Sequence, residues 1–144
     1  MVIGIIGTRS RDSLEDQQDV FEALTDLLNR HEKPSHIGFG YSLVSGGCPK
    51  GGDRFAEVWA TAIGMPTFRC LPEGAGPADG HMNIHPALWD QYGRSAGYRR
   101  NIYIARDADW LIACVAANRK GGTEDTIKKF LTKGQEFKER LILV

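Results

Sequence analysis

The sequence has few of the features that mark several common protein classes. Its 144 residues include three cysteines, none of them in a CxxC pair, so neither a disulfide framework nor a structural zinc site is expected. Lysine plus arginine equals aspartate plus glutamate, at 18 each, so the overall charge indicates no nucleic-acid partner. The opening stretch MVIGIIGTRS is apolar only briefly and is broken by glycine, which argues against a signal peptide or membrane span there. We therefore expect a cytoplasmic protein without a membrane partner.

The composition is that of an ordinary globular chain. Hydrophobic residues make up 42% and charged residues 25% of the sequence, and the length predicts a single domain over residues 1–144. The charge is unevenly placed, because residues 1–80 hold 7 basic and 11 acidic side chains and residues 81–144 hold 11 and 7. This asymmetry favours an anionic ligand on the C-terminal half.

Apolar runs alternate with helical patterns along the chain. Strands are predicted at residues 2–7, 41–47, 66–71, 109–116 and 141–144, and amphipathic helices between them, the first capped by Ser13. Such alternation predicts an α/β fold, a three-layer Rossmann-like sandwich around a five-stranded, mainly parallel sheet in the order 3-2-1-4-5. Residues 72–94 are rich in glycine and proline and are predicted to be one long loop, typical of a functional lid or a mobile segment.

Three glycine-containing stretches follow predicted strands and precede helices: GTRS at residues 7–10, SGGCPKGGD at 45–53 and AANRKGGTED at 116–125. In a parallel sheet such loops open onto one crevice, where the unpaired amides of helix N-termini bind anions. The alternative is that these turns need glycine only for their own geometry. Neither a Walker loop nor G-x-G-x-x-G is present, which argues against an ATPase or a dinucleotide oxidoreductase.

Three longer segments carry a family resemblance: SGGCPKGGDRFAEVWA, HPALWDQYGRSAGYRRN and DADWLIACVAANRKGGTEDTI. They resemble, in order, the GGxxxGAD loop, the AGxxRN helix start and the GGT-x-[DE] loop of the SLOG superfamily. That superfamily includes the Lonely-guy nucleoside-monophosphate hydrolases and the Smf/DprA proteins. The resemblance implies a nucleotide or nucleotide-derived ligand at the strand ends and a homodimer. It does not by itself imply catalysis.

The first two loops supply one group of candidate ligand-binding residues, namely Gly7, Thr8, Arg9, Gly46, Gly47, Lys50, Gly51 and Asp53. The glycines would wrap a phosphate or sugar. Arg9 offers a fork suited to phosphate, although a surface charge is an equal alternative. For Asp53 the favoured interpretation is an N-cap of the following helix, ahead of ligand contact. Arg54 is interpreted as a solvated helix residue.

The second group comes from the later two motifs: Arg100, Asn101, Gly121, Gly122, Thr123, Glu124 and Asp125. The resemblance assigns Arg100 to the ligand phosphate and places Asp125 where Lonely-guy enzymes carry a glutamate near the ribose. A carboxylate there can stabilise an oxocarbenium ion during N-glycoside cleavage. Aspartate is one methylene shorter, and Lys120 replaces the proline of that subfamily. Thr123 is the predicted helix cap, and first-turn acids also stabilise a helix dipole.

The aromatic residues and histidines leave further choices. His81 and His85 lie in the glycine-rich loop, so no metal site is predicted, and no cofactor is expected. Trp89 and Tyr92 could stack on a nucleobase or anchor the loop. Tyr98 and Ile102, four residues apart on a helix, are predicted to be core contacts.

Three functions are compatible with these patterns. The leading hypothesis is a binding or sensing module for a nucleotide-like small molecule, because three glycine loops converge without an evident acid–base pair. The alternative is an enzyme that releases the base from a nucleoside 5′-monophosphate, with Arg100 and Asp125 as its catalytic residues. Single-stranded DNA binding, as in the Smf/DprA relatives, is the least favoured because the chain is neutral.

Overall fold

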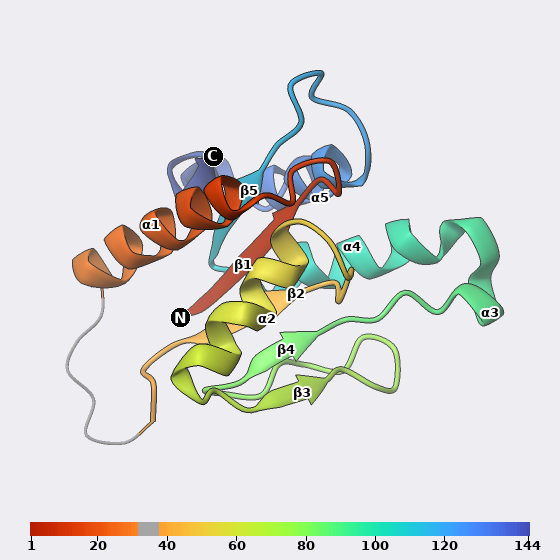
Figure 1. The fold of residues 1–144 in the computed structure, drawn as a ribbon. Coiled ribbons are helices and arrows are strands. Elements are labelled where there is room, and N and C mark those ends of the chain that lie inside the picture. The colour runs from red at the N-terminus through yellow and green to blue at the C-terminus, as the bar shows by residue number, and fades with distance from the viewer. Residues whose placement is uncertain (32–37) are drawn as a thin grey trace.

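A computed structural model describes residues 1–31 and 38–144, and its centre is a parallel sheet of six strands (Figure 1). The sheet order is β3-β4-β2-β1-β5-β6, and every pair of neighbouring strands is parallel. The strands are β1 Val2–Gly7, β2 Ser42–Ser45, β3 Thr67–Arg69, β4 Met82–Ile84, β5 Trp110–Cys114 and β6 Leu141–Leu143. The α-helices are α1 Leu14–His31, α2 Gly52–Ile63, α3 Trp89–Tyr92, α4 Ala96–Asp107 and α5 Gly122–Leu131, with short 3-10 turns at Gly93–Ser95 and Gln135–Arg140.

Helices cover both faces of the sheet. Helices α1 and α2 pack together over β1, β2 and β5 on one face, and α4 and α5 pack together on the other (Figure 1). Each face has its own apolar cluster, one centred on Ile3, Leu24 and Phe55 and the other on Ile104, Leu111 and Phe130. The alternating side chains of β1 supply both clusters. The predicted three-layer α/β architecture is therefore confirmed.

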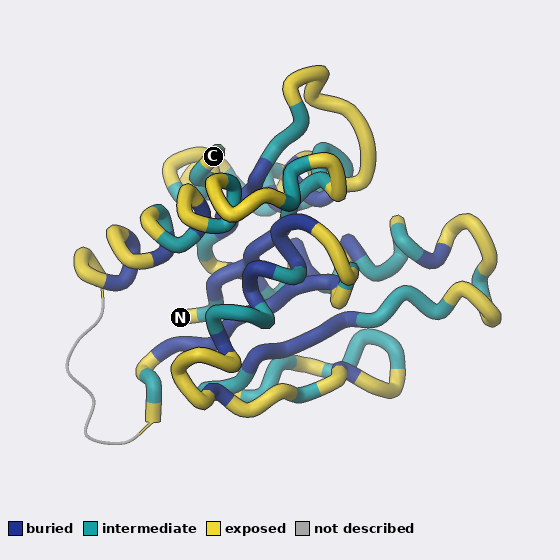
Figure 2. The backbone as a smooth tube through the Cα atoms, viewed as in Figure 1, coloured by how far each residue is buried: buried dark blue, intermediate teal, exposed yellow. Residues whose placement is uncertain are grey.

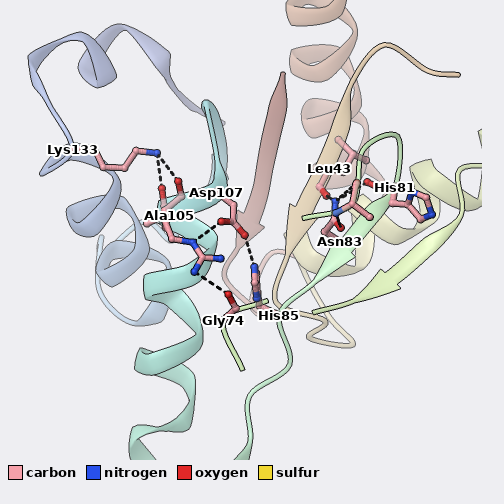
Figure 3. A network of polar contacts seen from close by, with 10 residues as sticks. Leu43, Gly74, His81, Asn83, His85, Ala105, Asp107 and Lys133 are labelled. Atoms are coloured by element: carbon pink, nitrogen blue, oxygen red, sulfur yellow. Dashed lines mark hydrogen bonds and ion pairs between the residues drawn. The ribbon is translucent and has the colours of Figure 1, made fainter. Parts of the chain in front are cut away.

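The number of strands was predicted wrongly, because β4 lies inside the segment expected to be a loop. The five predicted strands keep their relative order, but β4 is inserted between β3 and β2 and pairs with both. Three residues between Gly80 and Pro86 are too short a run to be distinguished from a loop. The buried side chain of Asn83 ties this short strand to its surroundings: its amide nitrogen lies 3.1 Å from the carbonyl oxygens of Leu43 and His81 (Figure 3) and 3.1 Å from that of Ala78.

Helix α1 begins as its sequence predicts. The Ser13 hydroxyl accepts the backbone N–H of Asp16 at 3.0 Å, and the Asp16 carboxylate accepts the backbone N–H of Ser13 at 3.2 Å. This reciprocal arrangement is a capping box with aspartate in place of the usual glutamate. None of the described helices is long and apolar enough to cross a membrane.

Burial follows the layers closely, as Figure 2 shows for β1, β2 and β4 in the middle of the molecule. Helix α4 departs from the prediction. Its residues Tyr98 and Ile102 were expected in the core but are 56% and 50% exposed, because Ala96, Ile104 and Ala105 form the buried face instead. The i, i+4 spacing identified a stripe on the helix without showing which stripe the sheet would cover.

Candidate functional site

A small cavity lies between the carboxyl end of β1, the N-terminal parts of α2 and α5, and the middle of α4. Its volume is about 70 Å³, and its lining consists of Ile6, Gly7, Cys48, Asp53, Arg100, Asn101, Ile104, Gly122, Thr123 and Thr126. The three sequence motifs singled out above all contribute to it. Of the predicted residues, Gly7, Asp53, Arg100, Asn101, Gly122 and Thr123 are in this lining. A larger hollow along α1 contains no residue of the three motifs.

Two helices begin at this cavity without a side-chain cap. Helix α2 follows Gly51 and α5 follows Gly121, and neither N-cap position makes a side-chain hydrogen bond to the helix start. The predicted caps Asp53 and Thr123 are therefore wrong, because each helix starts earlier, at Gly52 and at Gly122. Uncapped first-turn amides carry partial positive charge and are suited to hold an anion.

Asp53 lies inside the first turn of α2 and holds the loop before it, which we term the β2–α2 loop (residues 46–51). One carboxylate oxygen accepts the Cys48 N–H at 3.1 Å, and the Gly46 N–H also donates to this carboxylate. The side chain is buried, and burial raises its pKa to about 6 against the opposing effects of Arg100 and these amides. Asp53 is thus an organising residue of the site.

Arg100 reaches the cavity from the second turn of α4. Its Nη1 donates a hydrogen bond to the Gly46 carbonyl, and its Nε is buried with no hydrogen-bond partner in the described part of the chain. A Cβ on Gly46 would lie 2.4 Å from Arg100 Nη1, so glycine there makes room for the guanidinium. A buried N–H donor without a partner is costly unless a ligand supplies an acceptor.

Gly51, the last residue of this loop, and Gly52, the first residue of α2, lie close against other backbone of the protein. A Cβ on Gly51 would lie 2.4 Å from the Thr8 carbonyl oxygen, and one on Gly52 would lie 2.3 Å from the backbone of Ile6. Helix α2 therefore starts in direct contact with the end of β1. Gly51, expected to wrap a phosphate or sugar, and Gly52 instead allow α2 to approach the end of β1.

Asn101 connects the cavity to Asp125. Its amide nitrogen lies 3.1 Å from an Asp125 carboxylate oxygen and 3.3 Å from the Gly122 carbonyl. The same Asp125 oxygen accepts a hydrogen bond from Lys129, one turn further along α5. Asp125 thus lies behind Asn101, outside the cavity lining, with its charge already paired.

The other predicted ligand residues lie at the rim or away from the cavity. The Thr8 hydroxyl is 3.1 Å from that of Ser10. Glu124 pairs with Arg119. The remaining predicted residues are exposed: Arg9, Gly47, Lys50 and Gly121.

Sequence reasoning missed Asp12, which accepts the Gly51 N–H at 2.8 Å and a hydrogen bond from Arg54 Nε at 2.9 Å. Arg54 is therefore an ion-pair partner and not merely solvated. A carboxylate and an arginine 42 positions apart give no local signal.

A second polar cluster lies at the far end of α4. His85 Nε2 is 2.6 Å from an Asp107 carboxylate oxygen, and both side chains are buried (Figure 3). Burial opposes ionisation of Asp107, but hydrogen bonds from His85 and Arg106 outweigh it and lower its pKa. Among the described residues, no group of three or more His, Cys, Asp or Glu side chains could hold a metal ion.

Residues 72–76 are fastened to α4 beside this cluster. Glu73 accepts two hydrogen bonds from Arg99, each of 3.0 Å, and a third from Tyr103. The Arg99 guanidinium lies 3.7 Å from the centre of the Tyr92 ring. Trp89 is 52% exposed and its ring edge lies against Gly97. The segment expected to be a functional lid or a mobile loop is therefore anchored in part to the helix that carries Arg100.

Comparison with known proteins identifies one distant relative among curated sequences. The chain is 29% identical over 115 residues to the Gene 61 protein of Mycobacterium phage D29, an alignment that covers 80% of this chain and 78% of the phage protein. No family model matches the sequence. No solved structure matches it.

Proposed function

We propose that the protein binds the phosphate group of a nucleotide or nucleotide-derived small molecule in the cavity between α2, α4 and α5. The single observation that carries this proposal is the buried Nε of Arg100, which has no hydrogen-bond partner among residues 1–31 and 38–144, beside two uncapped helix N-termini. Each of these features is a donor without an acceptor, and a tetrahedral oxyanion supplies several acceptors at once. The resemblance to SLOG proteins supports the same ligand class.

Binding without hydrolysis is favoured over N-glycoside cleavage. An oxocarbenium ion is stabilised by a carboxylate that faces it and whose charge is not already paired with another group. Asp125, the candidate for that role, is engaged by Lys129 and Asn101 and is not part of the cavity lining. The hydrolase therefore remains the alternative, and release of free base from nucleoside monophosphates that disappears in Asp125→Ala would establish it.

A homodimer is the partner that we propose for the outer face of α4. Tyr98 and Ile102 on that helix and Trp89 before it are each at least half exposed. Large apolar side chains grouped on a surface are typical of interaction sites. Light scattering of the wild type and of Tyr98→Ser/Ile102→Ser would test this, since the double variant should be monomeric.

The main test is calorimetry with nucleoside mono- and diphosphates, ADP-ribose and cyclic nucleotides. At least one should bind to the wild type, and Arg100→Met should weaken that binding about tenfold or more, because a charged hydrogen bond is lost. Arg94→Met is the matched control, since Arg94 is exposed and outside the cavity lining. Failure of the whole panel to bind, or equal binding by Arg100→Met, would overturn the proposal.

A further inference from the structure

Resting on the proposed function, we infer that Asp53 is a specificity-determining residue: the site accepts an oxyanion only together with one proton held between the anion and the Asp53 carboxylate. Most anion sites are lined by donors alone. This one includes a buried carboxylate, 7% exposed, in the same small cavity as the Arg100 guanidinium. An anion that fills about 70 Å³ cannot avoid the neighbourhood of that carboxylate.

The charges around the cavity favour the uptake of one proton together with the anion. Arg100 contributes one positive charge, and the start of each helix contributes roughly half a charge. Asp53 in its ionised form subtracts one, so the site as a whole carries about one positive charge. A dianion exceeds this, whereas a monoanion, or a dianion accompanied by a proton on Asp53, matches it. Like charges in a shared buried site force one of them to hold a proton.

Most neighbouring charged groups are held in ion pairs, so Asp53 is the group whose protonation state changes when an anion binds. Glu57, one turn along α2, raises the pKa of Asp53, and Arg100 on α4 lowers it.

The other charged groups nearby are paired. On α5, Glu124 is paired with Arg119 and Asp125 with Lys129. On α2, Arg54 beside Asp53 is paired with Asp12. Cys48 contributes a thiol to the lining. Burial raises the pKa of Asp53 to about 6, so this carboxyl group can take up a proton near neutral pH.

The geometry leaves the carboxylate able to share that proton. The Cys48 and Gly46 amides donate to Asp53, and a carboxylate has about four acceptor positions. A protonated phosphate oxygen can therefore donate to an ionised Asp53. A fully deprotonated oxyanion of the same shape has no such hydrogen, so it binds only to the form of the protein in which Asp53 is protonated.

Inorganic phosphate and sulfate are the probes that separate these cases, because they match in shape and differ in the proton. Binding is followed by NMR through the amides of Gly52 and Gly122 at several pH values. At pH 7.5, phosphate should bind about tenfold more tightly than sulfate, because its monoanion H₂PO₄⁻ matches the site charge and carries a hydrogen that it can donate to the ionised Asp53. Sulfate should gain about twentyfold on lowering the pH to 5.5, because its affinity is scaled by the protonated fraction of Asp53. The ¹³C carboxyl titration of Asp53 should move to higher pH when sulfate is present.

Asp53→Asn should abolish both the discrimination and the pH dependence of sulfate binding. Glu57→Gln is the matched control, since it removes an acid from the same helix but outside the cavity lining, and its preference for phosphate should persist. If Asp53→Asn fails to fold, the wild-type carboxyl titration decides. Equal, pH-independent binding of both anions would overturn this inference and leave the proposed function intact, whereas absence of binding by either anion at any pH would contradict both.

Discussion

Two loops of this protein each bring a pair of glycines to the start of a helix, and the two pairs have different roles. The β2–α2 loop and the β5–α5 loop (residues 115–121) each bring a pair of adjacent glycines to the start of a helix. A Cβ on Gly52 would lie 2.3 Å from the backbone of Ile6, whereas one on Gly122 would find only Asn101 Nδ2, at 4.0 Å, among the described residues. One glycine pair makes room for the protein and the other leaves room beside the cavity. A glycine-rich motif alone does not distinguish the two.

The largest effect is expected from Gly52→Ala. Its added methyl group would overlap the backbone of β1, which cannot give way as a flexible side chain could. We expect the free energy of unfolding to fall by about 3 kcal/mol, at the upper end of overpacking penalties. Urea denaturation measures it. A stability equal to that of the wild type would show that α2 can shift away from β1, and the comparison between the loops would fail.

The pH dependence of stability sharpens the description of the β2–α2 loop. Because the pKa of Asp53 in the folded protein is about 6, above the ordinary value of 3.8, the native state holds this proton more tightly than the unfolded chain does. The stabilising contribution is complete below about pH 4 and is lost as the pH rises through about 6. Ionisation of Asp53 should therefore lower the free energy of unfolding by about 3 kcal/mol over that range.

Asp53→Asn, compared with the wild type by urea denaturation at pH 4.5 and 7.5, isolates this contribution. The variant should be less stable relative to the wild type at the lower pH and gain on it at the higher one. A constant difference between the two proteins would mean that burial does not perturb this carboxyl group. Such a result would place Asp53 among ordinary surface acids.

The sequence predicts the layers of this fold well because each depends on a repeated local pattern. The buried strand β1 and the Ser13 cap of α1 are carried by neighbouring residues. Strand β4 is not predictable in this way, since three residues become a strand only by pairing with β2 and β3. The same holds for the exposed face of α4, which the sheet selects.

The candidate site divides along the same line. Glycine spacing and the position of Arg100 predict where the cavity lies, because strand ends in a parallel sheet share one edge. The Asp12–Arg54 and His85–Asp107 pairs join residues far apart in sequence, and no local pattern marks them. The role of Asp53 depends on where α2 begins, and a shift of two residues turns an expected cap into a buried carboxylate.

Gly122→Ala tests the open side of the comparison. With its nearest described neighbour at 4.0 Å, the added methyl group should change the free energy of unfolding by less than about 0.5 kcal/mol. The methyl group would occupy space at the cavity lining, so the affinity for the best nucleotide of the calorimetric panel should fall about tenfold, the equivalent of one lost hydrogen bond. Reduced stability with unchanged affinity would reverse the assignment of the two loops.

The smallest effect is expected from Glu124→Gln, which removes the ion pair holding the β5–α5 loop. Arg119 and Glu124 are partly exposed, with side chains 46% and 22% accessible, and solvent screens such pairs strongly. The thermal unfolding midpoint should therefore stay within experimental error of the wild type. Because Glu124 is outside the cavity lining, nucleotide affinity should also be unchanged. A clear loss of affinity would mean that the Arg119–Glu124 ion pair must hold the β5–α5 loop in place for the ligand to bind.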